Sequence, residues 1–240
     1  MIECLGKRTF LPSDQEKFLA LSGDYNPIHV DAPAARDTFA GQCTVHGMHI
    51  TLWALELFTL RHGSAATKFK VDFRKLIYLN EEVSFDWHEK KAKLLVTKDG
   101  VVAVEIKLVL GALTPNDAVH ITHQNSPLQC IERSFLECSE MLSQPFNGHG
   151  DPALTGEMFP KCCLVYGHMA VYEMATISYV VGMECPGLHS LSVAYAIEFK
   201  STVAKPFYSV LRTDERFKLV TSAIEGQTLS AEIEAIHTKC

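Results

Sequence analysis

The side chains best suited to chemistry meet in one short stretch, SGDYNPIH at residues 22–29. Asp24 and His29 lie five positions apart, on either side of Pro27. Pro27 biases Asn26 toward an extended conformation, and an Asn side chain can bond to the nearby backbone of a turn. Such a turn can aim a carboxylate and an imidazole at one water molecule, as an acid/base pair suited to neutral pH. A capped turn with an exposed acid and a packed histidine explains the same residues, because short motifs often match by chance.

This stretch and the residues after it resemble the signature of the MaoC-like, (R)-specific enoyl-thioester hydratases. That signature joins S/T-G-D-x-N-P-[LIV]-H to an Ala-rich turn, a Phe and V-H-G-M. Residues 22–29 are followed here by Ala34-Ala35, Phe39 and Val45-His46-Gly47-Met48. The resemblance covers residues 18–48 strongly, and the rest of the first half agrees only in the order of its elements. Nothing in the second half matches Asp24 or His29.

The resemblance implies a hot-dog fold and a hydro-lyase that acts on acyl thioesters. The family adds water to trans-2-enoyl thioesters to give (R)-3-hydroxyacyl thioesters, or dehydrates the latter. By this resemblance Asp24 and His29 hold and activate the water, and neither a metal nor another cofactor is expected. The substrate is then an acyl-CoA or an acyl-carrier-protein thioester, and both carriers stay open.

The resemblance also assigns roles around this pair. The amide of Gly47, at the positive start of a helix, would stabilise negative charge on the thioester oxygen. Asn26 would hold the catalytic turn, and Tyr25 would line the acyl pocket. His46 joins these residues as an oxyanion or substrate-binding candidate.

Hydrophobic periodicity predicts the elements that position these residues. Ser13 and Glu16 fit a capping box for a short helix that ends near Gly23. Residues 47–61 form a long helix that is apolar on most faces. An antiparallel meander follows, because residues 69–73, 83–87, 94–97 and 101–109 alternate like strands and Asp99-Gly100 is a hairpin signal.

The second half repeats this order. Residues 162–183 are a second apolar stretch, and residues 193–199, 207–211, 217–221 and 228–236 alternate like strands. Gly47 and Gly167 open comparable segments 120 residues apart, and Phe73 and Phe199 end comparable strands 126 residues apart. The sequence therefore predicts an α+β double hot-dog fold of two tandem units, each a central helix wrapped by an antiparallel sheet. We place the catalytic unit at residues 1–125, a degenerate unit at 126–240, and the connection at roughly 116–151.

Hot-dog hydratases usually build each site between two units, so the resemblance implies an intramolecular pseudo-dimer with a single site. Tyr166 stands where the first unit has His46, which fits a degenerate copy. The second unit would support the fold and shape the acyl tunnel. A homodimer of such chains remains possible.

Composition narrows the function further. The 240 residues are 47% hydrophobic and 21% charged, as in folded proteins, and carry a net charge of −6, which excludes a general nucleic-acid binder. Eight scattered cysteines without a C-x-x-C pair favour free thiols in a reducing cytoplasm. Residues 162–183 are long enough to span a membrane, but Glu173 and other polar residues favour a buried helix.

Alternative readings remain for several residues. Cys43, His46 and His49 are spaced like metal ligands, but a fourth ligand is not evident and no metal is expected. A basic cluster either meets the phosphates of the carrier or forms a solvated strand face, and its members are Lys68, Lys70, Arg74 and Lys75. A hot-dog thioesterase and a non-catalytic acyl-thioester binding module are the competing functions.

Overall fold

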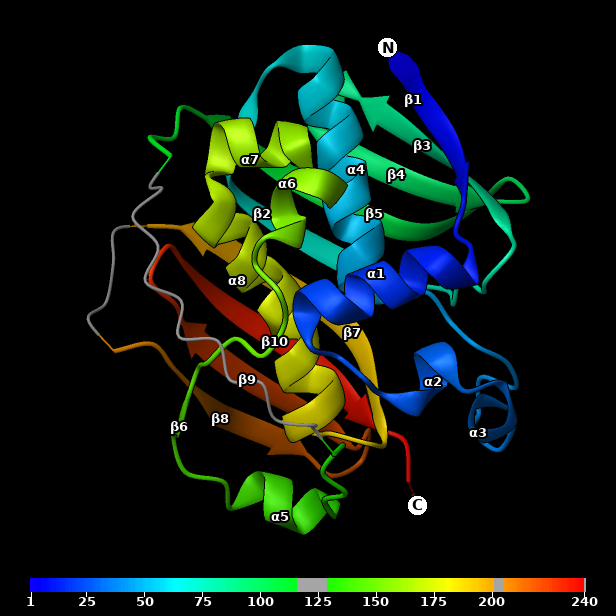
Figure 1. Cartoon of the computed structure of the whole chain (residues 1–240), viewed down its shortest axis with the longest axis vertical. Helices are drawn as coiled ribbons and strands as arrows, with labels where there is room; N and C mark the ends of the chain where they lie inside the picture. The colour runs from blue at the N-terminus through cyan, green and yellow to red at the C-terminus, as the bar shows by residue number, and fades with distance from the viewer. Residues whose placement is uncertain (116–128, 201–204, 240) are drawn as a thin grey trace.

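The computed structural model describes residues 1–115, 129–200 and 205–239. In these ranges, ten antiparallel strands form one sheet in the order β1-β3-β4-β5-β2-β7-β10-β9-β8-β6. The two longest helices, α4 and α8, lie side by side against one face of this sheet (Figure 1). The predicted arrangement of a helix against an antiparallel sheet is therefore present twice in the chain.

The first half of the chain supplies one end of the sheet. Its strands, in sheet order, are β1 (Ile2–Thr9), β3 (Glu82–His88), β4 (Lys93–Lys98), β5 (Val101–Gly111) and β2 (Ala65–Phe73). A 3-10 turn, η1 (Glu89–Lys91), joins β3 to β4. Val83, Phe85 and Trp87 are buried while their neighbours on β3 are more exposed, so the predicted period of two holds.

The second half mirrors that order. Its strands run outward from the centre as β7 (Ser190–Phe199), β10 (Leu229–His237), β9 (Leu219–Glu225), β8 (Phe207–Asp214) and β6 (Gln144–Pro145). β6 lies beside β8 as β1 lies beside β3, although β6 falls in the stretch expected to be only a connection. The predicted boundary between residues 125 and 126 lies outside the described residues.

The two halves of the sheet meet at β2 and β7 with a symmetric register. Phe69 pairs with Ile197, and Val71 pairs with Tyr195. Phe69 and Tyr195 are separated by the same number of residues as Phe73 and Phe199, and so are Val71 and Ile197. Superposing one unit on the other therefore turns the pair of Phe69 and Ile197 into the pair of Tyr195 and Val71. A local two-fold axis therefore passes through the pair of Lys70 and Ala196.

The first half contains helices α1 (Pro12–Ser22), α2 (Pro27–Val30), α3 (Ala32–Arg36) and α4 (Gly47–His62). The predicted capping box of Ser13 and Glu16 is wrong. Leu11 is the N-cap of α1, and its amide donates to Asp14 Oδ2 at 2.8 Å. The helix begins earlier than expected because Pro12 has no N–H to satisfy and its fixed φ suits a first turn.

The second half contains helices α5 (Phe135–Ser139), α6 (Leu154–Met158), α7 (Pro160–Tyr166), α8 (His168–Tyr179) and the π-helical η2 (Val180–Glu184). The predicted continuous helix over residues 162–183 is therefore interrupted. Gly167 breaks it with φ 83° and ψ 155°, a conformation that is essentially restricted to glycine. Across the described ranges, no helix combines the length and apolar character that a membrane span needs.

Buried carboxylates join the helical layer to its surroundings. Glu56 on α4 accepts hydrogen bonds from the amides of Lys161 and Cys162 at the start of α7, at 2.9 and 2.8 Å. Glu173 on α8 accepts from the amides of Gln227 and Thr228 in the turn between β9 and β10. These amides satisfy the carboxylates inside otherwise apolar packing, which explains the charged residue in the second apolar stretch.

Candidate active site

The turn that follows α1 is fixed by contacts with both halves of the chain. Gly23 ends α1 in the left-handed conformation, with φ 78°. Asn26 Oδ1 then accepts from the amide of Ile28 at 3.1 Å and caps α2. Its Nδ2 donates to the carbonyl of Gly182 at 2.9 Å, in η2 of the second half. Asn26 thus ties the turn to the opposite unit.

Asp24 is 1% exposed, and both oxygens of its carboxyl group are hydrogen bonded. Oδ1 accepts from the amide of Asn26 at 3.2 Å, and Oδ2 accepts from the hydroxyl of Ser178 on α8 at 2.7 Å. Burial raises the pKa of this carboxyl, while His29, Ser178 and the Asn26 amide act in the opposite direction. Gly182 leaves the carboxyl its space, because a Cβ there would lie 2.2 Å from Oδ1.

His29 is held in one orientation by the residues before α4. Its Nδ1 lies 2.9 Å from the carbonyl oxygen of Thr44, so Nδ1 carries a proton and donates it. Nε2 then holds the lone pair of the neutral ring and can accept a proton. Burial lowers the pKa of this imidazole, and Asp24 together with the Thr44 bond raises it.

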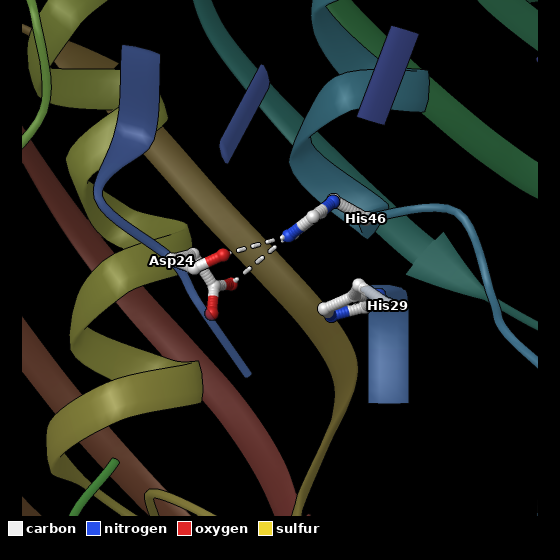
Figure 2. Close-up of side chains that lie close together, drawn as sticks. All are labelled: Asp24, His29 and His46. Carbon is white, nitrogen blue, oxygen red and sulfur yellow. Dashed lines mark hydrogen bonds and ion pairs between the residues drawn. The ribbon is translucent and has the colours of Figure 1, made fainter. Parts of the chain in front are cut away.

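Asp24, His29 and His46 meet at one point, although they come from three segments of the first half. One carboxylate oxygen of Asp24 and one ring nitrogen of each histidine lie within 4.8 Å of one another. Figure 2 shows His46 directed at Asp24, with the ring of His29 beside it. The two imidazole rings stack with their centroids 3.7 Å apart.

A cavity opens in front of Asp24 and His29. The first half lines it with residues around the turn, the start of α4 and the end of β2, and the second half adds residues of α8, η2 and β7. The lining consists of Asp24, Ile28, His29, Thr44, Val45, Gly47, Ile50, Phe73, Lys75, Leu76, Ile77, Ser178, Val181, Gly182, Ser190, Leu191 and Ser192. The cavity is therefore shared between the two halves.

Gly47 is the first residue of α4, and its amide has no acceptor within the helix. The ring of Phe73 packs directly on it, because a Cβ at Gly47 would lie 2.9 Å from two ring carbons. Phe73 is held in turn by an edge-to-face contact with Tyr195 of β7, at a centroid distance of 5.0 Å. Only a glycine fits between this ring and the start of the helix.

Comparison with known proteins agrees with this architecture. Residues 5–109 match the family model described as the MaoC like domain. These residues belong to the MaoC-like domain family. No curated protein matches the sequence significantly.

Solved structures share the fold of the whole chain. A MaoC-like dehydratase superposes with TM-score 0.65 and 11% identity, over 99% of this chain and 98% of its own. A Mycobacterium tuberculosis protein described as a double hotdog fold gives 0.63 and 8%, over 98% and 95%. A MaoC-domain protein of Chloroflexus aurantiacus gives 0.58 and 10%, over 100% and 95%. These identities show the fold alone, and they confirm the predicted double hot-dog architecture.

Three predicted oxyanion or substrate-binding residues of the MaoC-like domain do not line the cavity. Tyr25 is 46% exposed and does not line the cavity, whereas the adjacent Asp24 is 1% exposed and does. His46 is completely buried behind His29, with its two nitrogens bonded to Gln15 and Asp24. Asn26 uses its side-chain amide to bond the backbone of Ile28 and Gly182, and it does not line the cavity. None of these three side chains is placed to contact a ligand in the cavity.

Ser178 and Gly182 are two site residues that the sequence did not reveal. Both come from the second half and touch Asp24 of the MaoC-like domain. Ser178 nevertheless left a signal, because it is one of the few polar residues in a stretch whose helix is buried. A buried hydroxyl needs a partner, but the sequence does not distinguish a distant one from the carbonyl four residues earlier in the helix.

The basic residues of the MaoC-like domain divide into two kinds. Lys68 pairs with Glu198 at 3.3 Å, Lys70 with Asp72 at 3.3 Å, and Arg74 with Glu105 at 2.8 Å. Lys75 lines the cavity, and within the described ranges it has no acidic partner. The metal-like spacing of Cys43, His46 and His49, from which no site was expected, does not bring these side chains to a common point. In the same ranges, the group close enough to share an ion is Asp24, His29 and His46.

Proposed function

We propose that the chain is a hydro-lyase that hydrates trans-2-enoyl thioesters to (R)-3-hydroxyacyl thioesters, or catalyses the reverse dehydration. The observation that carries the proposal is the meeting of Asp24 and His29 in one cavity that also contains the start of α4. A carboxylate, an imidazole and a free helix amide are the groups this addition requires. The stereochemistry comes from the resemblance to (R)-specific hydratases.

Asp24 and His29 would bind the water between them. As the water oxygen bonds to C3, the pair removes one proton, and a proton passes to C2, so that the elements of water are added and the pair is restored. The bond from His29 Nδ1 to Thr44 supports this role, because it leaves Nε2 as the proton acceptor. General acid/base catalysis of this kind contributes roughly 10²–10⁴ in rate.

Negative charge develops on the thioester oxygen when the nucleophile adds to C3. Gly47 lines the cavity at the positive end of α4, where its amide would stabilise this charge. The packing of Phe73 on Gly47 fixes the amide in place before the substrate binds. This arrangement is the oxyanion site of the proposed mechanism.

We infer that one site is present in each chain and that units near residues 1–125 and 126–240 form an intramolecular pseudo-dimer. The second unit lacks a turn equivalent to that of Asp24 and His29. By the 120-residue spacing Tyr166 corresponds to His46, and the Tyr166 hydroxyl accepts a 3.0 Å hydrogen bond from the amide of Ala66 on β2. Titration with a non-reactive acyl thioester should give one equivalent bound per chain, and two equivalents would contradict the one-site proposal.

The carrier of the acyl group is proposed to bear the phosphates of coenzyme A or of an acyl-carrier-protein phosphopantetheine. Lys75 supports this, because it is exposed at the cavity and has no acidic partner among the described residues. None of the seven described cysteines forms a disulfide, which supports a reducing, cytoplasmic setting.

The proposal is tested with crotonyl-CoA, by the loss of absorbance of the conjugated enoyl group. Asp24→Asn and His29→Gln should each lower kcat by about 10²-fold or more while the protein stays folded. Asp31→Asn is the matched control, because this exposed carboxylate caps α3 through the amide of Ala34 and Asn can replace it as a cap. Release of free thiol would show a thioesterase instead, and binding without either reaction would show a binding module.

A further inference from the structure

His46 belongs to a buried chain of hydrogen bonds that lies behind the cavity. It is 0% exposed, Gln15 of α1 is 1% exposed, and His49, one turn further along α4, is 0% exposed. His46 Nδ1 lies 2.6 Å from Gln15 Oε1, and Gln15 Nε2 lies 3.3 Å from His49 Nδ1. The positions of the protons in this series of hydrogen bonds follow from which atoms face one another.

The amide of Gln15 is oriented by the backbone. The N–H of His46 can only donate, and its partner at 3.3 Å is the side-chain atom Oε1 of Gln15. This atom must therefore be the oxygen and not the nitrogen of the amide group. Because an amide oxygen only accepts, His46 Nδ1 must carry a proton to form its 2.6 Å contact.

The other ring nitrogen of His46 also faces acceptors. Nε2 lies 3.2 Å from the backbone carbonyl oxygen of Asp24 and 3.7 Å from its carboxylate Oδ2 (Figure 2). A carbonyl oxygen cannot donate, so this hydrogen bond requires a proton on Nε2 as well. A neutral ring would leave one nitrogen lone pair against an oxygen lone pair, on one side or the other.

We propose that His46 is an imidazolium ion at neutral pH and is the buried counter-ion of the Asp24 carboxylate. His46 does not line the cavity, so it is a positioning residue and not a catalytic one. Its ring is parallel to that of His29 within 24°, and two charged rings stacked at this distance would repel each other. The positive charge on His46 therefore keeps His29 neutral.

The titratable groups that face His46 are Asp24, His29 and His49, and Arg8 acts on His49 in turn. Burial holds the pKa of His46 well below its usual value and charges on His29 and His49 would lower it further, whereas the bond to the Asp24 carbonyl raises it. The effect of His29 vanishes while that ring is neutral. The positive charge on His46 stabilises the buried carboxylate of Asp24. Gln15 Oε1 and the carbonyl oxygen of Asp24 each accept one proton of His46, and together they keep the ring doubly protonated.

The consequence for catalysis rests on the proposed hydratase function. With the proton on His46, Asp24 remains ionised despite its burial, and His29 remains able to accept a proton from the water. Gln15 maintains this state from α1, outside the cavity. His49 is assigned as the neutral tautomer with its proton on Nε2, because its Nδ1 accepts from Gln15.

Histidine protonation is measured directly by long-range nitrogen–proton NMR spectra of the full chain labelled at its imidazole nitrogens. The His46→Gln variant identifies the His46 signals. At neutral pH, His46 should show protons on both nitrogens, His29 on Nδ1 alone and His49 on Nε2 alone. A neutral His46 in either tautomer would overturn the proposal, whatever the protein's activity.

Two substitutions at Gln15 separate the charge state from simple packing. Gln15→Glu should raise the pH at which His46 loses its second proton by about one unit, and Gln15→Met should lower it by a similar amount. In each variant the basic limb of the kcat/KM profile should shift in the same direction as the pH at which His46 loses its second proton, with little change in KM. Gln144→Met on β6 is the control and should move neither. Equal effects of both Gln15 variants would refute the charge assignment, and NMR shifts without kinetic shifts would refute only its catalytic consequence.

Discussion

The hydroxyl of Ser178 donates a 2.7 Å hydrogen bond to Asp24 Oδ2 across 154 positions of the sequence. Ser178 lies on the central helix of the second half, and Asp24 lies in the turn of the first half. The half that lacks a counterpart of Asp24 and His29 therefore helps to stabilise the carboxylate of the other half. The same half supplies Gly182, whose missing side chain leaves room for that carboxyl.

Ser178→Ala should lower kcat by about tenfold with little change in KM, because a hydrogen bond to a charged group contributes about 1.5–3 kcal/mol. The lost donor had favoured the ionised form, so the pKa of Asp24 rises and the acidic limb of the kcat/KM profile moves to higher pH. Ser222→Ala, a buried serine on β9, should show neither effect. An unchanged acidic limb in Ser178→Ala would exclude this role.

Gly47→Ala should reduce kcat by about a hundredfold, because the new Cβ collides with Phe73 and displaces the amide proposed to bind the thioester oxygen. The double variant Gly47→Ala/Phe73→Leu removes the collision and should recover part of the lost rate. Steady-state kinetics of both variants and of Phe73→Leu alone provide the measurement. If the double variant is no faster than Gly47→Ala, the collision is not the cause.

Lys75→Ala should raise KM for a CoA thioester by about two- to fivefold at low ionic strength and leave kcat unchanged. The same variant should not affect an N-acetylcysteamine thioester, which lacks the phosphates. Lys68→Ala is the matched control, since Lys68 is paired with Glu198 and does not line the cavity. Equal effects on both substrates would show that Lys75 does not act through phosphate.

The stability of the fold should depend on pH through His49. Burial lowers the pKa of this imidazole well below its usual value, and the nearby Arg8 lowers it further. Below about pH 6.5 the unfolded chain then binds a proton that the folded chain refuses, so the free energy of unfolding falls as the pH decreases. His49→Phe should reduce this slope by up to about 1.4 kcal/mol per pH unit. Urea unfolding at pH 7 and pH 5 gives the slope, and an identical slope in the variant would count against the assignment.

The sequence determined the features that depend on near neighbours. Asp24 and His29 share one turn, Gly47 opens a helix after it, and the strands alternate, so local pattern and family resemblance were enough to predict them. The two-fold relationship was also visible in the spacing of Phe73 and Phe199, which the register of β2 and β7 reproduces. Each of these features depends on residues close together in the sequence or on the repetition of one pattern along it.

The tertiary structure decided everything that depends on contacts between distant segments. Ser178 and Gly182 reach Asp24 only because β2 and β7 join the two units edge to edge and lay α4 beside α8. Tyr25 and Asp24 are adjacent in sequence, yet one is exposed and the other buried. The proposed protonation of His46 follows from a backbone amide, a glutamine and a carbonyl that only the fold assembles. Hydrogen bonds and burial are properties of packed neighbours, and the packing places partners together across the whole chain.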